Sequence, residues 1–96
     1  MLYILELLFY NIYGETMNEN DLYKIVGKNI KKYRLLYSKK YPITQEMLAE
    51  MIGVSTSLIS NLESNSISQG ISIITLYKIS VVLEVPISKF LEDNNE

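Results

Sequence analysis

The sequence predicts an all-α domain of five helices, and its spacing, its capping residues and its composition favour that fold class. Apolar residues recur three and four positions apart, the spacing of one helix face, in four ranges: 21–38, 44–52, 55–63 and 72–83. Polar residues that can cap a helix stand at the start of the last three ranges. A short fifth helix is expected after Pro86, because proline suits the first turn of a helix. The length of 96 residues and the apolar fraction of 48% suit one small domain with a compact core.

Residues 44–63 are the segment around which this prediction is built, and they are expected to form a helix, a tight turn and a second helix. The hydroxyl of Thr44 can cap the first helix, and Gly53 can take the left-handed conformation that ends it. Ser55 can cap the second helix. The inward residues of that second helix would be Ile59 and Leu62.

The outward side of the second helix would carry short, uncharged groups that donate and accept hydrogen bonds. These residues are Thr56, Ser57, Ser60 and Asn61. Such groups match the base edges in the major groove of DNA, where a recognition helix lies. For the serines, an ordinary solvated helix surface is the alternative interpretation.

The same segment resembles the helix-turn-helix of the Cro/CI-type (XRE) family of transcriptional regulators. The family pattern is met by Thr44, Gln45, Leu48, Ala49, Gly53, Val54, Ser55, Ile59, Ser60, Leu62 and Glu63. The likeness extends over about residues 26–91 and is long, with fixed spacing, which makes the motif specific. It implies a lambda-repressor-like DNA-binding domain.

The resemblance also implies roles for individual residues. The positions that contact DNA in the family are occupied here by Gln45, Ser55, Thr56, Ser57, Ser60 and Asn61. Arg34 and Glu63 match a structural ion pair rather than base-reading residues. The implied function is a sequence-specific regulator, a repressor, that binds a double-stranded DNA operator. A homodimer reading half-sites about 10 bp apart is the usual arrangement.

The charge of −2 is unusual for a DNA-binding domain, which commonly carries a basic excess. However, seven of the nine basic residues lie between positions 24 and 40, and no acid occurs between Asp21 and Glu46. In the predicted loop within this stretch, Lys39 and Lys40 are candidates for phosphate contact. After Glu63 the basic turn of the family is replaced by neutral residues, of which Asn65 can donate to a phosphate. Because neutral contacts release no counterion, a modest salt dependence is expected.

Residues 1–13 are almost entirely apolar, with Glu6 as their only charge. We therefore divide the chain into an apolar extension, residues 1–16, and a domain, residues 17–96. The extension is a poor secretory signal and is short for a membrane span. Three interpretations stay open: an extra element packed on the domain, a dimerisation arm, or a segment outside the natural protein, whose start would then be Met17.

Two further helices are assigned core and surface residues. The core side of residues 21–38 would consist of Val26, Ile30, Tyr33 and Tyr37, and that of residues 72–83 of Ile73, Leu76, Ile79, Ser80 and Leu83. A second apolar stripe on residues 72–83 consists of Ile74, Tyr77 and Val81. This stripe needs cover, either from a second copy as a dimer surface or from residues 2–13. Glu84 replaces the glycine usual at this helix end, so a strained or altered cap is expected.

Composition argues against catalysis and metal binding. The chain has neither histidine nor cysteine, and no nucleophile–base or paired-carboxylate pattern stands out. We therefore expect no enzyme, no metal and no cofactor, and a cytoplasmic protein without a membrane segment. The alternative function is a protein-interaction module or an antitoxin-like component with weak DNA affinity. A protein antagonist is a further expected kind of partner, since no ligand-sensing domain is visible.

Overall fold

The computed structural model describes residues 18–36, 42–64, 66 and 69–93. Within these residues the chain forms four α-helices and one 3-10 helix, and no strand occurs. The helices are α2 (Glu19–Leu36), α3 (Gln45–Ile52), α4 (Thr56–Glu63), α5 (Ile73–Leu83) and η1 (Ile87–Leu91). The prediction of an all-α fold is confirmed, and the fifth predicted helix is the 3-10 helix. The predicted extension, residues 1–16, lies outside the described residues.

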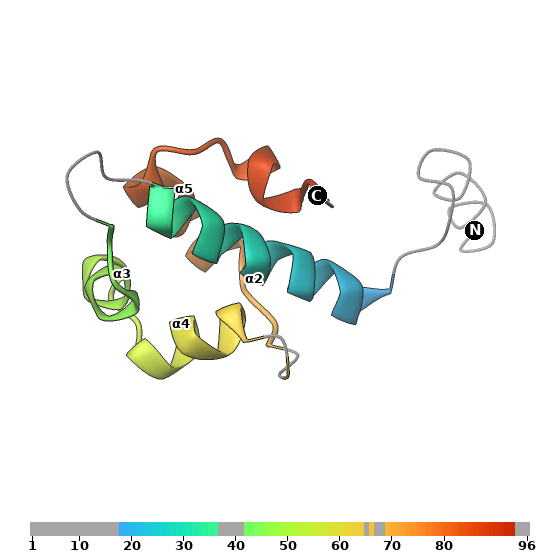
Figure 1. Ribbon diagram of the computed structural model, residues 1–96, viewed down its shortest axis with the longest axis horizontal. Coiled ribbons are helices and arrows are strands. Elements are labelled where there is room, and N and C mark those ends of the chain that lie inside the picture. The colour runs from blue at the N-terminus through green and yellow to red at the C-terminus, as the bar shows by residue number, and fades with distance from the viewer. Residues whose placement is uncertain (1–17, 37–41, 65, 67–68, 94–96) are drawn as a thin grey trace.

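Helix α2 is the central element (Figure 1), with α3 and α4 on one side and η1 on the other. It packs against α4, η1 and α5, while α3 packs against α4 and α5. Every element, together with Ile43 two residues before α3, contributes to a single apolar core. The buried apolar residues are Val26, Ile30, Ile43, Leu48, Ala49, Ile52, Ile59, Leu62, Leu76, Ile79, Leu83 and Phe90. This shared core fixes the orientation of the helix-turn-helix formed by α3 and α4.

The helix starts follow the predicted capping residues. The side-chain oxygens of Thr44, Ser55 and Ser72 each accept a hydrogen bond from the backbone N–H three residues on, at 3.0–3.1 Å. Each cap therefore satisfies an N–H group that the helix itself leaves unpaired. Gly53 ends α3 in the left-handed conformation, at φ 77°, as predicted. These local signals determine where α3, α4 and α5 begin.

Gly27 sets how closely α2 approaches α4. A Cβ atom at this position would lie 1.8 Å from the backbone oxygen of Leu62. Glycine inside a helix costs about 0.5–1 kcal/mol relative to alanine, so its presence here requires a packing reason. That reason is the contact with the last turn of α4, which only glycine permits.

Some core assignments made from sequence differ from the structure. Ile73 was expected on the inner side of α5 but is 70% exposed. It is the first residue of α5, beyond the part of the helix that other elements cover, whereas the predicted residues from Leu76 to Leu83 are buried. In α2, Tyr33 packs partly buried against the core, and Tyr37 lies outside the described residues. The predicted range 21–38 is observed as Glu19–Leu36.

Candidate nucleic-acid interface

The outward side of α4 carries the side chains that the sequence predicts there. Thr56, Ser57 and Ser60 are exposed and Asn61 is half-buried. Among the described residues, these four side chains have no hydrogen-bond partner. Their donors and acceptors are therefore available to a molecule that meets this side of α4. Ser55 is also exposed, and its oxygen accepts from the Leu58 N–H at 3.1 Å.

A buried ion pair supports α4 from behind. The Arg34 Nε donates to Glu63 Oε2 at 2.8 Å, and Nη2 donates to Glu63 Oε1 at 2.7 Å. Only 8% and 2% of the two side chains are exposed. The third nitrogen, Nη1, donates to the Ile43 carbonyl at 2.7 Å. The predicted pair is thus present, and its guanidinium joins α2, the segment before α3 and the end of α4.

Gln45 belongs to the same network. Its Nε2 donates to Glu63 Oε1 at 2.9 Å, in a half-buried position at the start of α3. One amide N–H and the amide oxygen of Gln45 remain available for other partners. Gln45 therefore has a bracing role, because its amide links the first residue of α3 to the last residue of α4; its predicted DNA contact would have to use the groups that remain.

Three predicted phosphate-contacting residues, Lys39, Lys40 and Asn65, lie outside the described residues. In the turn after α4, the Ser64 oxygen accepts from the Ser66 N–H at 3.3 Å, and their two hydroxyls lie 3.0 Å apart. The Ser64 and Ser66 hydroxyls thus bond to each other within this part of the turn.

Charge is distributed unevenly between the helices. The only charged residue of α4 is Glu63, which Arg34 neutralises. Exposed positive charge lies instead on α2, whose outward residues include Lys24, Lys28, Lys31 and Lys32. The surface of α4 is therefore polar but uncharged, which suits hydrogen bonding more than electrostatic attraction.

Sequence reasoning missed two positioning residues, Gly27 and Asn29. Asn29 is 3% exposed, and its Nδ2 donates to the carbonyls of Phe90 and Glu92, both at 2.8 Å. It thereby fixes η1 and the following residues against α2. A glycine and an amide within an apolar helical repeat are the signals that could have indicated close packing and a buried hydrogen bond.

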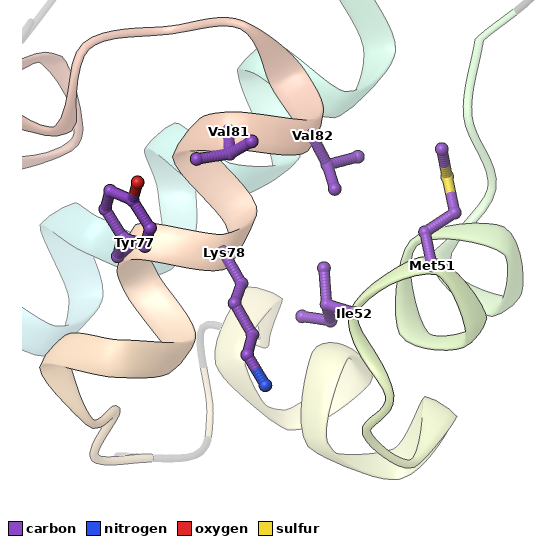
Figure 2. Close-up of a pocket in the computed structure, with 6 residues that line it drawn as sticks. All are labelled: Met51, Ile52, Tyr77, Lys78, Val81 and Val82. Atoms are coloured by element: carbon purple, nitrogen blue, oxygen red, sulfur yellow. The ribbon is translucent and has the colours of Figure 1, made fainter.

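The outer side of α5 contrasts with that of α4. Ile74, Tyr77 and Val81, predicted as a dimer surface or a covered stripe, are 64%, 61% and 56% exposed. A pocket of about 380 Å³ lies beside them, between α3 and α5 (Figure 2). Its lining residues are Met51, Ile52, Tyr77, Lys78, Val81 and Val82.

The part of the chain that the structure describes contains neither a metal site nor a membrane-spanning helix. There, no group of three or more His, Cys, Asp or Glu side chains could hold a metal ion. No helix there has both the length and the apolar character required to cross a membrane.

A helix-turn-helix family model matches residues 30–90, which include α3, the turn and α4. The chain belongs to the XRE-type helix-turn-helix family. Since Ile30 lies within α2 and Phe90 within η1, the matched region of this family member contains most of the described core.

The solved structures that resemble this helix-turn-helix protein include the following two. One is the N-terminal DNA-binding domain of SinR from Bacillus subtilis, with 34% identity and a TM-score of 0.62. That match covers 76% of this chain and 99% of the SinR domain. The other is the hypothetical transcription factor NHTF from Neisseria, with 24% identity and a TM-score of 0.65 over 83% of each chain; it supports the fold alone. No curated protein matches the sequence.

Proposed function

We propose that the protein is a sequence-specific DNA-binding transcriptional regulator that acts as a repressor in the cytoplasm. In this proposal α4 inserts into the major groove of a double-stranded operator, and two copies bind as a homodimer. Occupying a promoter in this way blocks transcription from it. The similarity to the DNA-binding domain of SinR supports the proposal, as does membership of the helix-turn-helix family.

The outward side of α4 is the observation that carries the proposal. It combines exposed, unpartnered hydrogen-bonding groups with a rigid support made by Arg34, Glu63 and Gln45. A recognition helix needs both, because base-edge hydrogen bonds are directional and lose strength when the donor is displaced. The uncharged surface is suited to reading bases, while phosphate contacts position the protein.

Individual residues have distinct proposed roles. Asn61 can form two hydrogen bonds to an adenine, and the Thr56 methyl group can contact a thymine methyl. Ser57 and Ser60 can contact either bases or phosphates. Ser55 can donate its hydroxyl hydrogen to a phosphate while its oxygen continues to cap α4.

Backbone contacts are proposed for Gln45, Lys39, Lys40 and Asn65. The two lysines would release counterions, whereas the amides would not. With two neutralised phosphates for each copy, affinity would fall roughly 10-fold per bound copy between about 50 and 200 mM salt. A basic recognition surface would give a steeper loss.

A dimer is proposed because one small domain reads few base pairs. Half-sites would then be spaced about 10 bp apart, or a multiple of that distance. The exposed stripe of Ile74, Tyr77 and Val81 is the candidate surface for contact between the two copies.

The test is a binding titration with the region upstream of the gene, at two salt concentrations, against random duplex of equal length. Asn61→Ala should reduce cognate binding by about 1–3 kcal/mol and relax sequence preference. Ser88→Ala, an exposed polar residue on η1, is the control and should bind like the parent. A reporter under the same upstream region should be repressed by the parent and released by Asn61→Ala.

The charge of the chain and of α4 favours a second function. The exposed surface of α4 has no positive charge, and the whole chain has a net charge of −2. These properties would fit a protein-interaction module or an antitoxin-like component that binds a protein antagonist and has weak DNA affinity. Absence of specific binding at either salt concentration would favour this second function.

A further inference from the structure

Helix α5 has an apolar outer side that no described residue covers. We define the α5 face as Ile73, Ile74, Tyr77 and Val81, which are 56–70% exposed. Ile74, Tyr77 and Val81 are spaced three and four residues apart, so they line up along one side of the helix. An exposed apolar row of this kind usually marks a contact surface.

The pocket between α3 and α5 continues this face and adds one charge to it. In Figure 2, Lys78 and Val82 extend from α5 on the side that faces Ile52 of α3. Lys78 is exposed, and within the described parts of the chain its ammonium group has no carboxylate partner. A matching occupant would therefore be largely apolar and carry a single negative charge.

Residues 1–13 of the same chain have this chemistry. Their sequence, MLYILELLFYNIY, is apolar except for Asn11 and for Glu6, the only charge. Placed on a helix, Leu2, Leu5, Phe9 and Ile12 would share one side, with Glu6 at its border. The segment is thus complementary to the α5 face in both apolar character and charge.

The path of the chain brings this segment within reach of α5. Gly70, just before α5, packs on α2, because a Cβ atom there would lie 3.5 Å from the Tyr23 ring. Asn18 is five residues before Tyr23, about 7.5 Å along the axis of α2. Residues 14–17 can span up to about 13 Å when extended. Residue 13 can therefore reach the vicinity of Gly70, three residues before the start of α5, from its own chain.

The length of residues 1–13 matches that of α5, and the position of Glu6 along the segment matches that of Lys78 along α5. As a helix, 13 residues span about 20 Å, against about 17 Å for the 11 residues of α5. If the segment runs antiparallel to α5 from the Ile73 end, Glu6 lies about 10 Å along it. Lys78 lies about 7.5 Å along α5 from Ile73, so the two charges would be side by side.

We infer that residues 1–13 bind to the α5 face of their own chain, with Glu6 beside Lys78. A short linker gives a tethered segment an effective concentration in the millimolar range. A second copy at micromolar concentration would compete poorly for the same surface unless it bound far more tightly. The free protein would then be a monomer, and use of α5 in a dimer would require release of the segment. This inference concerns the free protein and does not depend on DNA binding.

Carbodiimide coupling of the full chain tests the contact, because it joins a carboxylate to an amine in direct contact. An equimolar mixture of unlabelled and ¹⁵N-labelled chains is cross-linked without DNA, digested and analysed by mass spectrometry. The expected product is a Glu6–Lys78 cross-link in which the two peptides are either both unlabelled or both ¹⁵N-labelled. Links between peptides of different label would show that the segment binds a second copy, and absence of a Glu6–Lys78 link would show that it does not lie on α5; either result overturns the inference.

Charge reversal provides an independent measurement. Glu6→Lys and Lys78→Glu should each increase binding of a dye for exposed apolar surface several-fold, and the double variant should restore the parent level. Lys31→Glu, on the exposed side of α2, is the matched control and should leave dye binding unchanged. Equal dye binding by the parent and both single variants would contradict the inference. So would a native protein whose mass corresponds to a start at Met17.

Discussion

The outer sides of α4 and α5 differ in chemistry although one core supports both helices. Each helix buries an isoleucine completely, Ile59 in α4 and Ile79 in α5, both at 0% exposure. Outward, α4 presents hydroxyl and amide groups, whereas α5 presents a row of large apolar side chains. Since folding requires neither outer surface, each is explained by what it meets: nucleotides in the proposal for α4, and apolar protein surface for α5.

The largest expected effect comes from removing the support behind α4. Arg34→Met should lower the free energy of unfolding by about 3–5 kcal/mol, because the Glu63 carboxylate stays buried with only Gln45 as a partner. Urea denaturation followed by circular dichroism measures the loss. Because α4 and α5 share one core, this loss of stability should affect both helices, including their outer sides.

The control for this prediction removes both charges. Arg34→Met combined with Glu63→Leu should recover much of the lost stability, because no uncompensated buried charge remains. A single variant as stable as the parent would show that the buried pair contributes nothing to the position of α4.

A second change affects α4 without altering either outer surface. Gly27→Ala should destabilise the fold by about 3 kcal/mol, at the upper end of the range for overpacking, because the new methyl group collides with the Leu62 carbonyl. The helix-forming advantage of alanine, about 1 kcal/mol, is smaller than this clash. Thermal unfolding gives the measurement.

Gly70→Ala is the matched control for the second change. Its Cβ would lie 3.5 Å from Tyr23, an ordinary van der Waals distance, so its stability should stay close to that of the parent. Equal effects of the two substitutions would mean that the contact between α2 and α4 is not the reason for Gly27.

Features that depend on neighbouring residues were predictable from the sequence. The three capping residues and Gly53 act on groups within four residues, and the helical repeats identify Leu48, Ile59 and Ile79 as core. The ion pair of Arg34 and Glu63 was predicted from the family resemblance and not from the local sequence pattern. The resulting fold class agrees with the structure.

Features that depend on distant contacts were not predictable. Asn29 binds carbonyl groups 61 and 63 residues away, and Gly27 faces a carbonyl on another helix. The DNA contact of Gln45 was predicted from the family resemblance, whereas its bond to Glu63, 18 residues away, could not be read from the helical repeat. Ile73 has the correct spacing for the core, but only the packed fold shows that nothing covers the first turn of α5.

A smaller effect is expected at the ends of α3 and α5, which use the same backbone conformation with different residues. Gly53 has φ 77° and Glu84 has φ 54°. A residue with a Cβ costs about 1 kcal/mol or more in the left-handed region, where glycine has no such penalty. Glu84→Gly should therefore stabilise the protein by about 1 kcal/mol, and Gly53→Ala should destabilise it by a similar amount.

Chemical denaturation of the two variants beside the parent measures both changes. Among the described residues, apart from its chain neighbours and its own helix backbone, nothing lies within 4 Å of the position a Cβ atom would take at Gly53, so any loss there reports the backbone conformation. Two shifts of the same sign would indicate that the left-handed conformation is not what distinguishes these two helix ends.

The smallest effect on stability is expected on the outer side of α5, where the comparison with α4 is sharpest. In a chain that begins at Met17, Tyr77→Ser should change the free energy of unfolding by no more than about 0.5 kcal/mol, because Tyr77 is 61% exposed when only the described residues surround it. On a duplex with one half-site, it should also bind like the parent, whereas Asn61→Ala should bind more weakly. Denaturation and half-site titration of the two variants measure both properties. If Tyr77→Ser weakened half-site binding as much as Asn61→Ala, the two outer sides would not have separate functions, and DNA contact would have to extend to α5.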